Sequence, residues 1–163
     1  MNRLRKLFKQ RKVTIVYLFV ALLIFGLGLN SGYWLTFDMP WGPNYPLPSI
    51  FANTLFLVGF IKLLAFVVPM WVVQKLVLIT IVVLAGVGSH NLVKFTSAKQ
   101  LGQYLPYAAG LVYIFNPFFY TRLIAGQWMV LAGYALLPWA VLALWRFFAK
   151  PTKKTALIAG LWA

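Results

Sequence analysis

The chain has 163 residues, of which 63% are hydrophobic and only 10% are charged. A soluble domain carries about 25% charged residues, so this composition excludes an ordinary soluble domain and predicts an integral membrane protein. The formal net charge is +14, from 15 Lys and Arg against one acidic residue. In so apolar a chain we interpret this excess as membrane topology rather than nucleic-acid binding. The absence of cysteine excludes disulfides, thiol nucleophiles and cysteine-based metal sites.

The first helix is predicted directly after a basic N-terminus. Residues 1–12 carry six Lys and Arg side chains, and residues 13–29 are uncharged, apolar and just long enough for a membrane span. A secretory signal peptide is the alternative, but the Gly-Leu-Asn-Ser-Gly that follows is a poor cleavage site. Proline, glycine and aromatic residues then crowd residues 30–49. They forbid a continuous helix and predict a loop on the outer membrane face.

Further apolar stretches follow this loop. Spans are predicted over 71–88, 101–116 and 128–148, with a short outer turn between the last two. A new apolar run occupies 155–163, which is too short to cross a membrane. We expect it to be the start of a fifth helix and the chain to be the N-terminal part of a longer, truncated protein.

Residues 50–68 are ambiguous because Lys62 lies in the middle of an apolar stretch that is long enough to span. If they do not span, twelve Lys and Arg share the side of the N-terminus, and only Lys62, Lys75 and Arg122 lie opposite. Lys and Arg favour the cytoplasmic side of short loops. We therefore expect an amphipathic or re-entrant segment at 50–68, within a large outer loop over 30–70, and a cytoplasmic N-terminus. The expected fold is an all-α integral membrane protein with about four transmembrane helices.

Four charged residues are candidates for chemistry on the outer side. Asp38 is the sole acidic residue, and its carboxylate can act as a general base or a metal ligand. The alternative is a solvated Asp that caps a turn. Arg122 carries a planar fork suited to phosphate oxygens, and the alternative is an interfacial Arg that binds ordinary headgroups. Lys62 and Lys75 admit the same two interpretations.

Gln127 and Trp128 are candidates for a sugar site, because an amide bonds hydroxyl groups and an indole stacks on apolar sugar faces. An ordinary interfacial Trp is the alternative. His90 is the sole histidine and has no nearby carboxylate, so no metal site is predicted. The small residues over 85–89 permit close helix contact, which is common in membrane helices.

Two stretches carry a resemblance to a known family. They are residues 37–46, Phe-Asp-Met-Pro-Trp-Gly-Pro-Asn-Tyr-Pro, and residues 111–128, followed by Leu-Leu-Pro-Trp at 136–139. With the overall layout, they resemble polytopic membrane glycosyltransferases of the GT-C fold. The resemblance is to bacterial uncharacterised membrane proteins that are arabinofuranosyltransferase-like or YfhO-like.

This resemblance implies an acidic catalytic residue near the start of a large first outer loop, which is the position of Asp38. It implies a polyprenyl-phosphate-linked sugar as the donor and transfer with inversion, with Asp38 deprotonating or orienting the acceptor hydroxyl. Arg122 is assigned to the donor phosphate. Many members place a second acid in their loops, sometimes with a divalent cation. This chain has no second acid, so the ligands of such a cation would lie outside it.

The leading hypothesis is therefore the N-terminal part of a membrane glycosyltransferase, inactive on its own, in the cytoplasmic membrane of a prokaryote. Its expected partners are the lipid bilayer and a polyprenyl-phosphate-linked sugar, and no nucleic acid. The acceptor would be an envelope glycan or lipid on the outer face. The alternatives are a lipid or glycan transporter or flippase fragment, and a non-catalytic membrane subunit that packs against a partner.

Overall fold

The computed structural model describes residues 2–39, 41–44, 55–96 and 102–162, with the backbone alone for residues 2–10 and 27. These ranges contain helices and connecting turns but no β-strand, so the all-helical fold class is confirmed. The elements are α1 (Asn2–Phe25), the 3-10 turn η1 (Gly26–Leu29), α2 (Leu55–Ala65), α3 (Met70–Thr96), α4 (Leu105–Ile114), α5 (Pro117–Ala125), α6 (Trp128–Ala149) and α7 (Lys153–Trp162).

Two helices of the described chain are long and apolar enough to cross a membrane. They are α3 with 27 residues and α6 with 22. At 1.5 Å per residue they extend about 40 Å and about 33 Å, against a hydrocarbon core of about 30 Å. Length and composition support a membrane protein, although a buried helix of a soluble protein passes the same test. The four spanning helices stay a prediction, because α4 has only 10 residues and the first half of α1 is basic.

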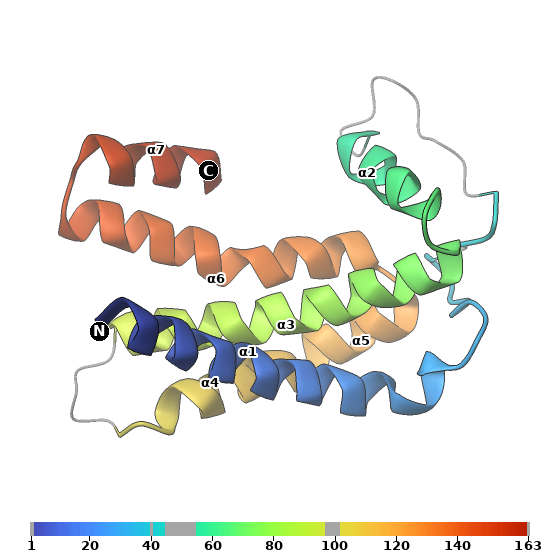
Figure 1. Cartoon of the computed structure of the whole chain (residues 1–163), viewed down its shortest axis with the longest axis horizontal. Helices are drawn as coiled ribbons and strands as arrows, with labels where there is room; N and C mark the ends of the chain where they lie inside the picture. The colour runs from blue at the N-terminus through green and yellow to red at the C-terminus, as the bar shows by residue number, and fades with distance from the viewer. Residues whose placement is uncertain (1, 40, 45–54, 97–101, 163) are drawn as a thin grey trace.

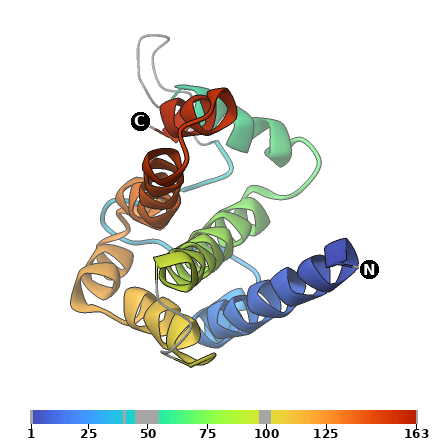
Figure 2. The same ribbon diagram turned by 90° about the vertical axis from the view of Figure 1, so that its left-hand side faces the viewer.

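α1 and α3 run in opposite directions, α4 and α5 lead back along the bundle, and α6 then runs in the same direction as α3 (Figure 1). α3 lies in the middle, and α1, α4 and α6 pack around it (Figure 2). The N-terminus, the end of α3 and the connection between α6 and α7 lie at one end of the bundle, which we call the basic end. The loop over 30–44, α2, the start of α3 and the corner between α5 and α6 lie at the other, which we call the loop end.

The charges divide between these two ends. The helix ends at the basic end carry Lys94, Arg146 and Lys153, in addition to the basic first turns of α1. Asp38 and Arg122 belong to segments of the loop end. Most of the described cations therefore lie at the basic end, while Lys62, Lys75 and Arg122 lie at the loop end with Asp38.

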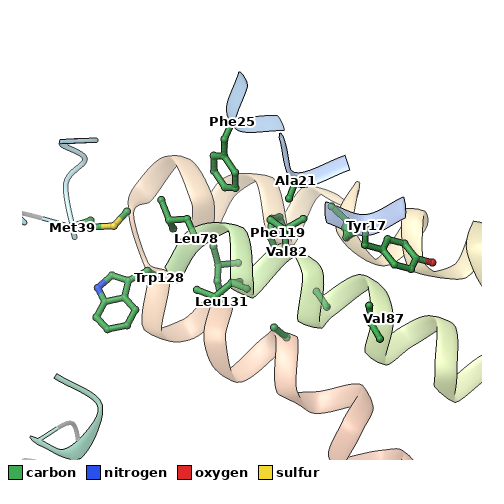
Figure 3. Close-up of a cluster of buried hydrophobic side chains, with 14 of the residues drawn as sticks. Tyr17, Ala21, Phe25, Met39, Leu78, Val82, Val87, Phe119, Trp128 and Leu131 are labelled. Carbon is green, nitrogen blue, oxygen red and sulfur yellow. The ribbon is translucent and has the colours of Figure 1, made fainter. Parts of the chain in front are cut away.

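One face of α1 supplies much of the core (Figure 3). Val13, Tyr17, Ala21 and Phe25 recur every four residues, and each is at most 3% exposed. This face of α1 packs closely against glycines in α3 and α4. A Cβ added at Gly86 or Gly110 would come closer than 3.0 Å to the Tyr17 ring or hydroxyl. The small residues of α3 thus allow tight helix packing, as the sequence suggests.

A proline inside α6 explains a link between α4 and α6. Pro138 has no N–H, so the carbonyl of Tyr134 loses its partner in the helix. The hydroxyl of Tyr113, in α4, donates to that carbonyl at 3.0 Å, and the hydroxyl of Tyr134 donates to the carbonyl of Tyr113 at 3.0 Å. The two rings stack with centroids 4.2 Å apart. The pair therefore satisfies a backbone group that the proline leaves open.

Several elements differ from the expected boundaries, and three of these differences bear on the site and the bundle. The turn expected between the helices at 101–116 and 128–148 contains a helix, α5. It forms because the Asn116 side chain accepts the N–H of Phe119 at 2.9 Å, with Pro117 in the first turn, and it ends at Gly126 with φ 78°. α3 continues past the expected end at 88 to Thr96, which places His90 inside the bundle at 3% exposure. Within the segment 50–68, residues 55–65 form α2, and 50–54 lie outside the described residues.

Candidate functional site

The loop after α1 is fastened to the start of α3. Gln74 is fully buried, its oxygen accepts the N–H of Trp34 at 2.9 Å, and its nitrogen donates to the carbonyl of Trp34 at 2.8 Å. The ammonium group of Lys75 donates to the carbonyl of Asn30 and lies 4.8 Å from the ring of Trp71. These bonds satisfy backbone groups of the loop at Trp34, which is half-buried, and at Asn30, which is exposed. They also fix where the next residues of the loop can lie.

The following residues dock on the corner between α5 and α6. The N–H of Asp38 donates to the carbonyl of Ala125, the last residue of α5, at 2.9 Å. Gly126 follows in a left-handed conformation, with φ 78°. A Cβ at Gly126 would come closer than 3.0 Å to Oγ1 of Thr36 and to 3.0 Å from the backbone nitrogen of Met39. The loop therefore uses the space that a glycine leaves free.

A polar triad joins the loop to this corner. Nε2 of Gln127 donates to Oδ2 of Asp38 at 2.7 Å, and Nη1 of Arg122 donates to Oε1 of Gln127 at 2.7 Å. Gln127 and Asp38 are 89 residues apart in the sequence. The backbone also ties the corner together, because the N–H of Gln127 donates to the carbonyl of Arg122 at 2.9 Å. We call Asp38, Gln127 and Arg122 the polar triad.

The triad holds opposite charges through a neutral amide. Asp38 is exposed, whereas Arg122 is half-buried and its guanidinium lies 5.4 Å from the ring of Phe118. Nε of Arg122 is buried and makes no hydrogen bond within the described part of the chain. A carboxylate accepts protons and a guanidinium binds anions through its N–H groups. This arrangement can accept a proton from a hydroxyl beside a group that attracts phosphate.

Trp128 follows the triad but lies below the surface. It is 3% exposed, and its ring meets that of Trp41 edge to face at 5.3 Å. Figure 3 shows Trp128 and Met39 facing the same region from α6 and from the loop. In this structure the indole presents almost no surface on which a sugar could stack.

An apolar groove begins beside Trp128 and runs between α2, α3 and α6. Its volume is about 300 Å³. The lining includes Leu57, Phe60, Leu76, Leu84, Trp128 and Ala132. Such a lining fits hydrocarbon and offers very little to a polar ligand.

Of the residues proposed from the sequence, Asp38, Arg122 and Gln127 come together, and Trp128 lies next to them. Lys75 is 7% exposed and holds the loop backbone, so it lies outside the triad. Lys62 is half-buried in α2, and no described hydrogen bond joins it to the triad. The described residues contain no group of three His, Asp or Glu that could hold a metal ion.

Sequence reasoning missed Gly126 and the carbonyl of Ala125 as parts of the site. The signal was present in the order Asn116-Pro117 followed by Gly126, since Asn and Pro begin helices and Gly ends them. That pattern predicts a helix whose end has free carbonyl groups.

Comparisons of the chain with protein-family models, with curated proteins and with solved structures found no match.

Proposed function

We propose that this chain is part of a membrane glycosyltransferase of the GT-C type, with the polar triad at its active site. The donor is a sugar linked to a polyprenyl phosphate, and the acceptor is a hydroxyl group of an envelope glycan or lipid. The observation that carries the proposal is the meeting of Asp38, the sole carboxylate side chain, with Arg122 through Gln127.

The proposed topology places the loop end on the outer face of the cytoplasmic membrane. The cations at the basic end favour the cytoplasm, which leaves Asp38 on the opposite side. In this proposal α1, α3, the α4–α5 pair and α6 cross the bilayer. α2 does not cross, because its 11 residues extend only about 16 Å, roughly half of the hydrocarbon core.

The triad supports a single displacement at the anomeric carbon. The carboxylate of Asp38 accepts the proton of the acceptor hydroxyl while the oxygen of that hydroxyl bonds to the anomeric carbon. The bond from the anomeric carbon to the phosphate oxygen breaks on the opposite face, so the configuration inverts. Polyprenyl phosphate leaves with the electron pair, and the positive charge of Arg122 stabilises the charge that develops on the phosphate.

The apolar groove supports a lipid-linked donor rather than a soluble one. Trp128 lines the groove and directly follows Gln127 of the triad. A hydrocarbon chain lying in the groove would therefore bring its phosphate towards the loop end. In this arrangement α2 covers the chain, and its exposed Phe56 and Leu63 face lipid or the interface.

The test is sugar transfer from polyprenyl-phosphate sugars by the full-length protein in proteoliposomes. We expect Asp38→Asn to lower turnover by about 10²–10⁴-fold, the usual contribution of a general base, with a much smaller change in the KM for the donor. Arg122→Met should raise that KM. Asn44→Ala is the matched control, because Asn44 is an exposed residue of the same loop.

Equal turnover in the wild type and Asp38→Asn would remove Asp38 from the mechanism. Movement of the lipid across the bilayer without sugar transfer would favour the transporter hypothesis instead.

A further inference from the structure

We propose that Gln127 is a positioning residue, which fixes the carboxylate of Asp38 and links it to the charge of Arg122. The proposal deepens the proposed function and rests on it for its catalytic meaning. Apart from catalysis, the proposal says that Gln127 joins the side chains of Asp38 and Arg122.

The chemistry of the three groups sets the orientation of the amide. A guanidinium group can only donate hydrogen bonds, so the group of Gln127 that faces Arg122 must be the oxygen. The amide nitrogen is thereby turned to Oδ2 of Asp38, to which it donates at 2.7 Å. Each end of the amide is thus engaged by one member of the triad, and one N–H and one lone pair are left over. The two engaged ends assign Gln127 a role in positioning Asp38 relative to Arg122.

The backbone of Gln127 is held as firmly as its side chain. Its N–H donates to the carbonyl of Arg122 at 2.9 Å, and its carbonyl accepts the N–H of Leu131, in the first turn of α6, at 3.0 Å. Asp38 is held separately, through its own N–H on Ala125. The only side-chain hydrogen bond to the Asp38 carboxylate in the described residues comes from Gln127. The backbone bond to Ala125 leaves the side chain of Asp38 free to rotate. The bond from Gln127 therefore selects the orientation of the carboxylate.

A neutral amide between the two charges has a consequence for reactivity. In a direct ion pair, Asp38 and Arg122 would take up part of each other's hydrogen-bonding capacity, and fewer of their polar atoms would be open to substrate. Through Gln127, the carboxylate is oriented towards the cation and keeps Oδ1 without a hydrogen bond to any described residue. Oδ1 is the atom that can take the acceptor proton in the proposed reaction.

The experiment exploits the fact that Asp38 is the only acidic side chain. The full chain is purified in detergent, and two properties of Asp38 are measured without any substrate. One is the infrared carboxylate stretching band, with Asp38→Asn as the spectroscopic blank. The other is the rate of carbodiimide coupling to a small amine, located by peptide mass spectrometry.

Gln127→Met keeps the size of the side chain but removes both of its hydrogen bonds. We expect this variant to shift the carboxylate band and to raise the coupling rate about twofold to tenfold, the factor for a net hydrogen-bond contribution of about 0.5–1.5 kcal/mol. Gln127→Glu keeps an acceptor for Arg122 but has no donor for Asp38, so it should shift the band of Asp38 as well. Because the new Glu adds its own band, the blank for this variant is the double variant Asp38→Asn, Gln127→Glu. Gln103→Ala, in the exposed connection before α4, is the matched control and should leave both readouts unchanged.

A band and a coupling rate that stay at their wild-type values in both Gln127 variants would overturn the proposal. Circular dichroism of each variant ensures that only folded protein is compared. If Gln127→Met shifts the band and the protein transfers no sugar, the proposed function fails and the positioning role stands. If Asp38 is required for transfer but the band does not respond to Gln127, the positioning role fails alone.

Discussion

Gly126→Ala tests whether the docking of the Asp38 segment depends on one backbone position. Gly126 has φ 78°, a conformation that costs an L-residue roughly 1–2 kcal/mol. Gly102 offers a matched control, because its φ is 77° and a Cβ there would meet nothing within 4 Å. Gly102→Ala therefore carries the same backbone cost with no steric cost.

At Gly126 the added methyl group has no room. It would overlap Oγ1 of Thr36 and lie 3.0 Å from the Cβ and nitrogen of Met39, where ordinary contacts are 3.4–4 Å. A backbone nitrogen cannot rotate away, so the whole segment must move outward. That movement breaks the bonds from Asp38 to Ala125 and from Gln127 to Asp38, each worth about 0.5–1.5 kcal/mol. We expect Gly126→Ala to cost about 2–5 kcal/mol and Gly102→Ala about 1–2 kcal/mol.

Two measurements separate the backbone cost of the positive φ from the steric cost of the added methyl group. Equilibrium unfolding in mixed micelles gives the two free-energy changes, and hydrogen exchange of residues 36–41 gives the local effect. The amide of Asp38 should exchange faster in Gly126→Ala and at the wild-type rate in Gly102→Ala. Equal destabilisation by the two substitutions, with unchanged exchange at Asp38, would refute the steric reasoning.

Three further predictions test the bundle and its orientation. Tyr113→Phe leaves a carbonyl of α6 without its donor and should cost about 1–2 kcal/mol of unfolding free energy. That cost should shrink in a Pro138→Ala background, which supplies the missing N–H, and an unchanged cost would contradict the assignment. Gly110→Ala should destabilise by about 1–3 kcal/mol, since its Cβ would force α3 and α4 apart, and a gain in stability would show that there is room. In the natural cysteine-free background, Phe37→Cys should react with an impermeant maleimide on intact cells and Lys153→Cys should not, whereas the reverse pattern would invert the proposed topology.

Helices and their charged ends could be predicted because both depend on local sequence. The uncharged apolar run over 128–148 gives α6, and the Lys residues after it mark the end of the helix. The extension of α3 to Thr96 was missed because His90 and Lys94 break the apolar run. His90 is tolerated inside the bundle, where its ring lies 4.5 Å from that of Tyr107 and 6.2 Å from that of Tyr17. Tertiary packing decided this boundary.

The candidate site could be predicted only residue by residue. Asp38 and Arg122 stand out because an acid is unique in this chain and few of the cations belong to the loop end. Their connection through Gln127 was not predictable, because no local pattern reports a bond between residues 89 apart. Lys75 fits the same chemical criteria as Arg122, yet it serves the loop backbone. Residue type alone does not separate the two roles.

The position of the site follows from what a helix end leaves unsatisfied. The last carbonyl groups of α5 have no partners within the helix, and a chain turn must supply donors for them. Gly126 and Gln127 donate to Leu123 and Arg122, which leaves the carbonyl of Ala125 for the N–H of Asp38. The loop thus supplies a hydrogen-bond donor to the end of α5. This contact places the carboxylate of Asp38 beside Gln127. A substitution that lets α5 continue past Gly126 would remove the free carbonyl and the carboxylate position together, so the fold and the proposed chemistry depend on the same turn.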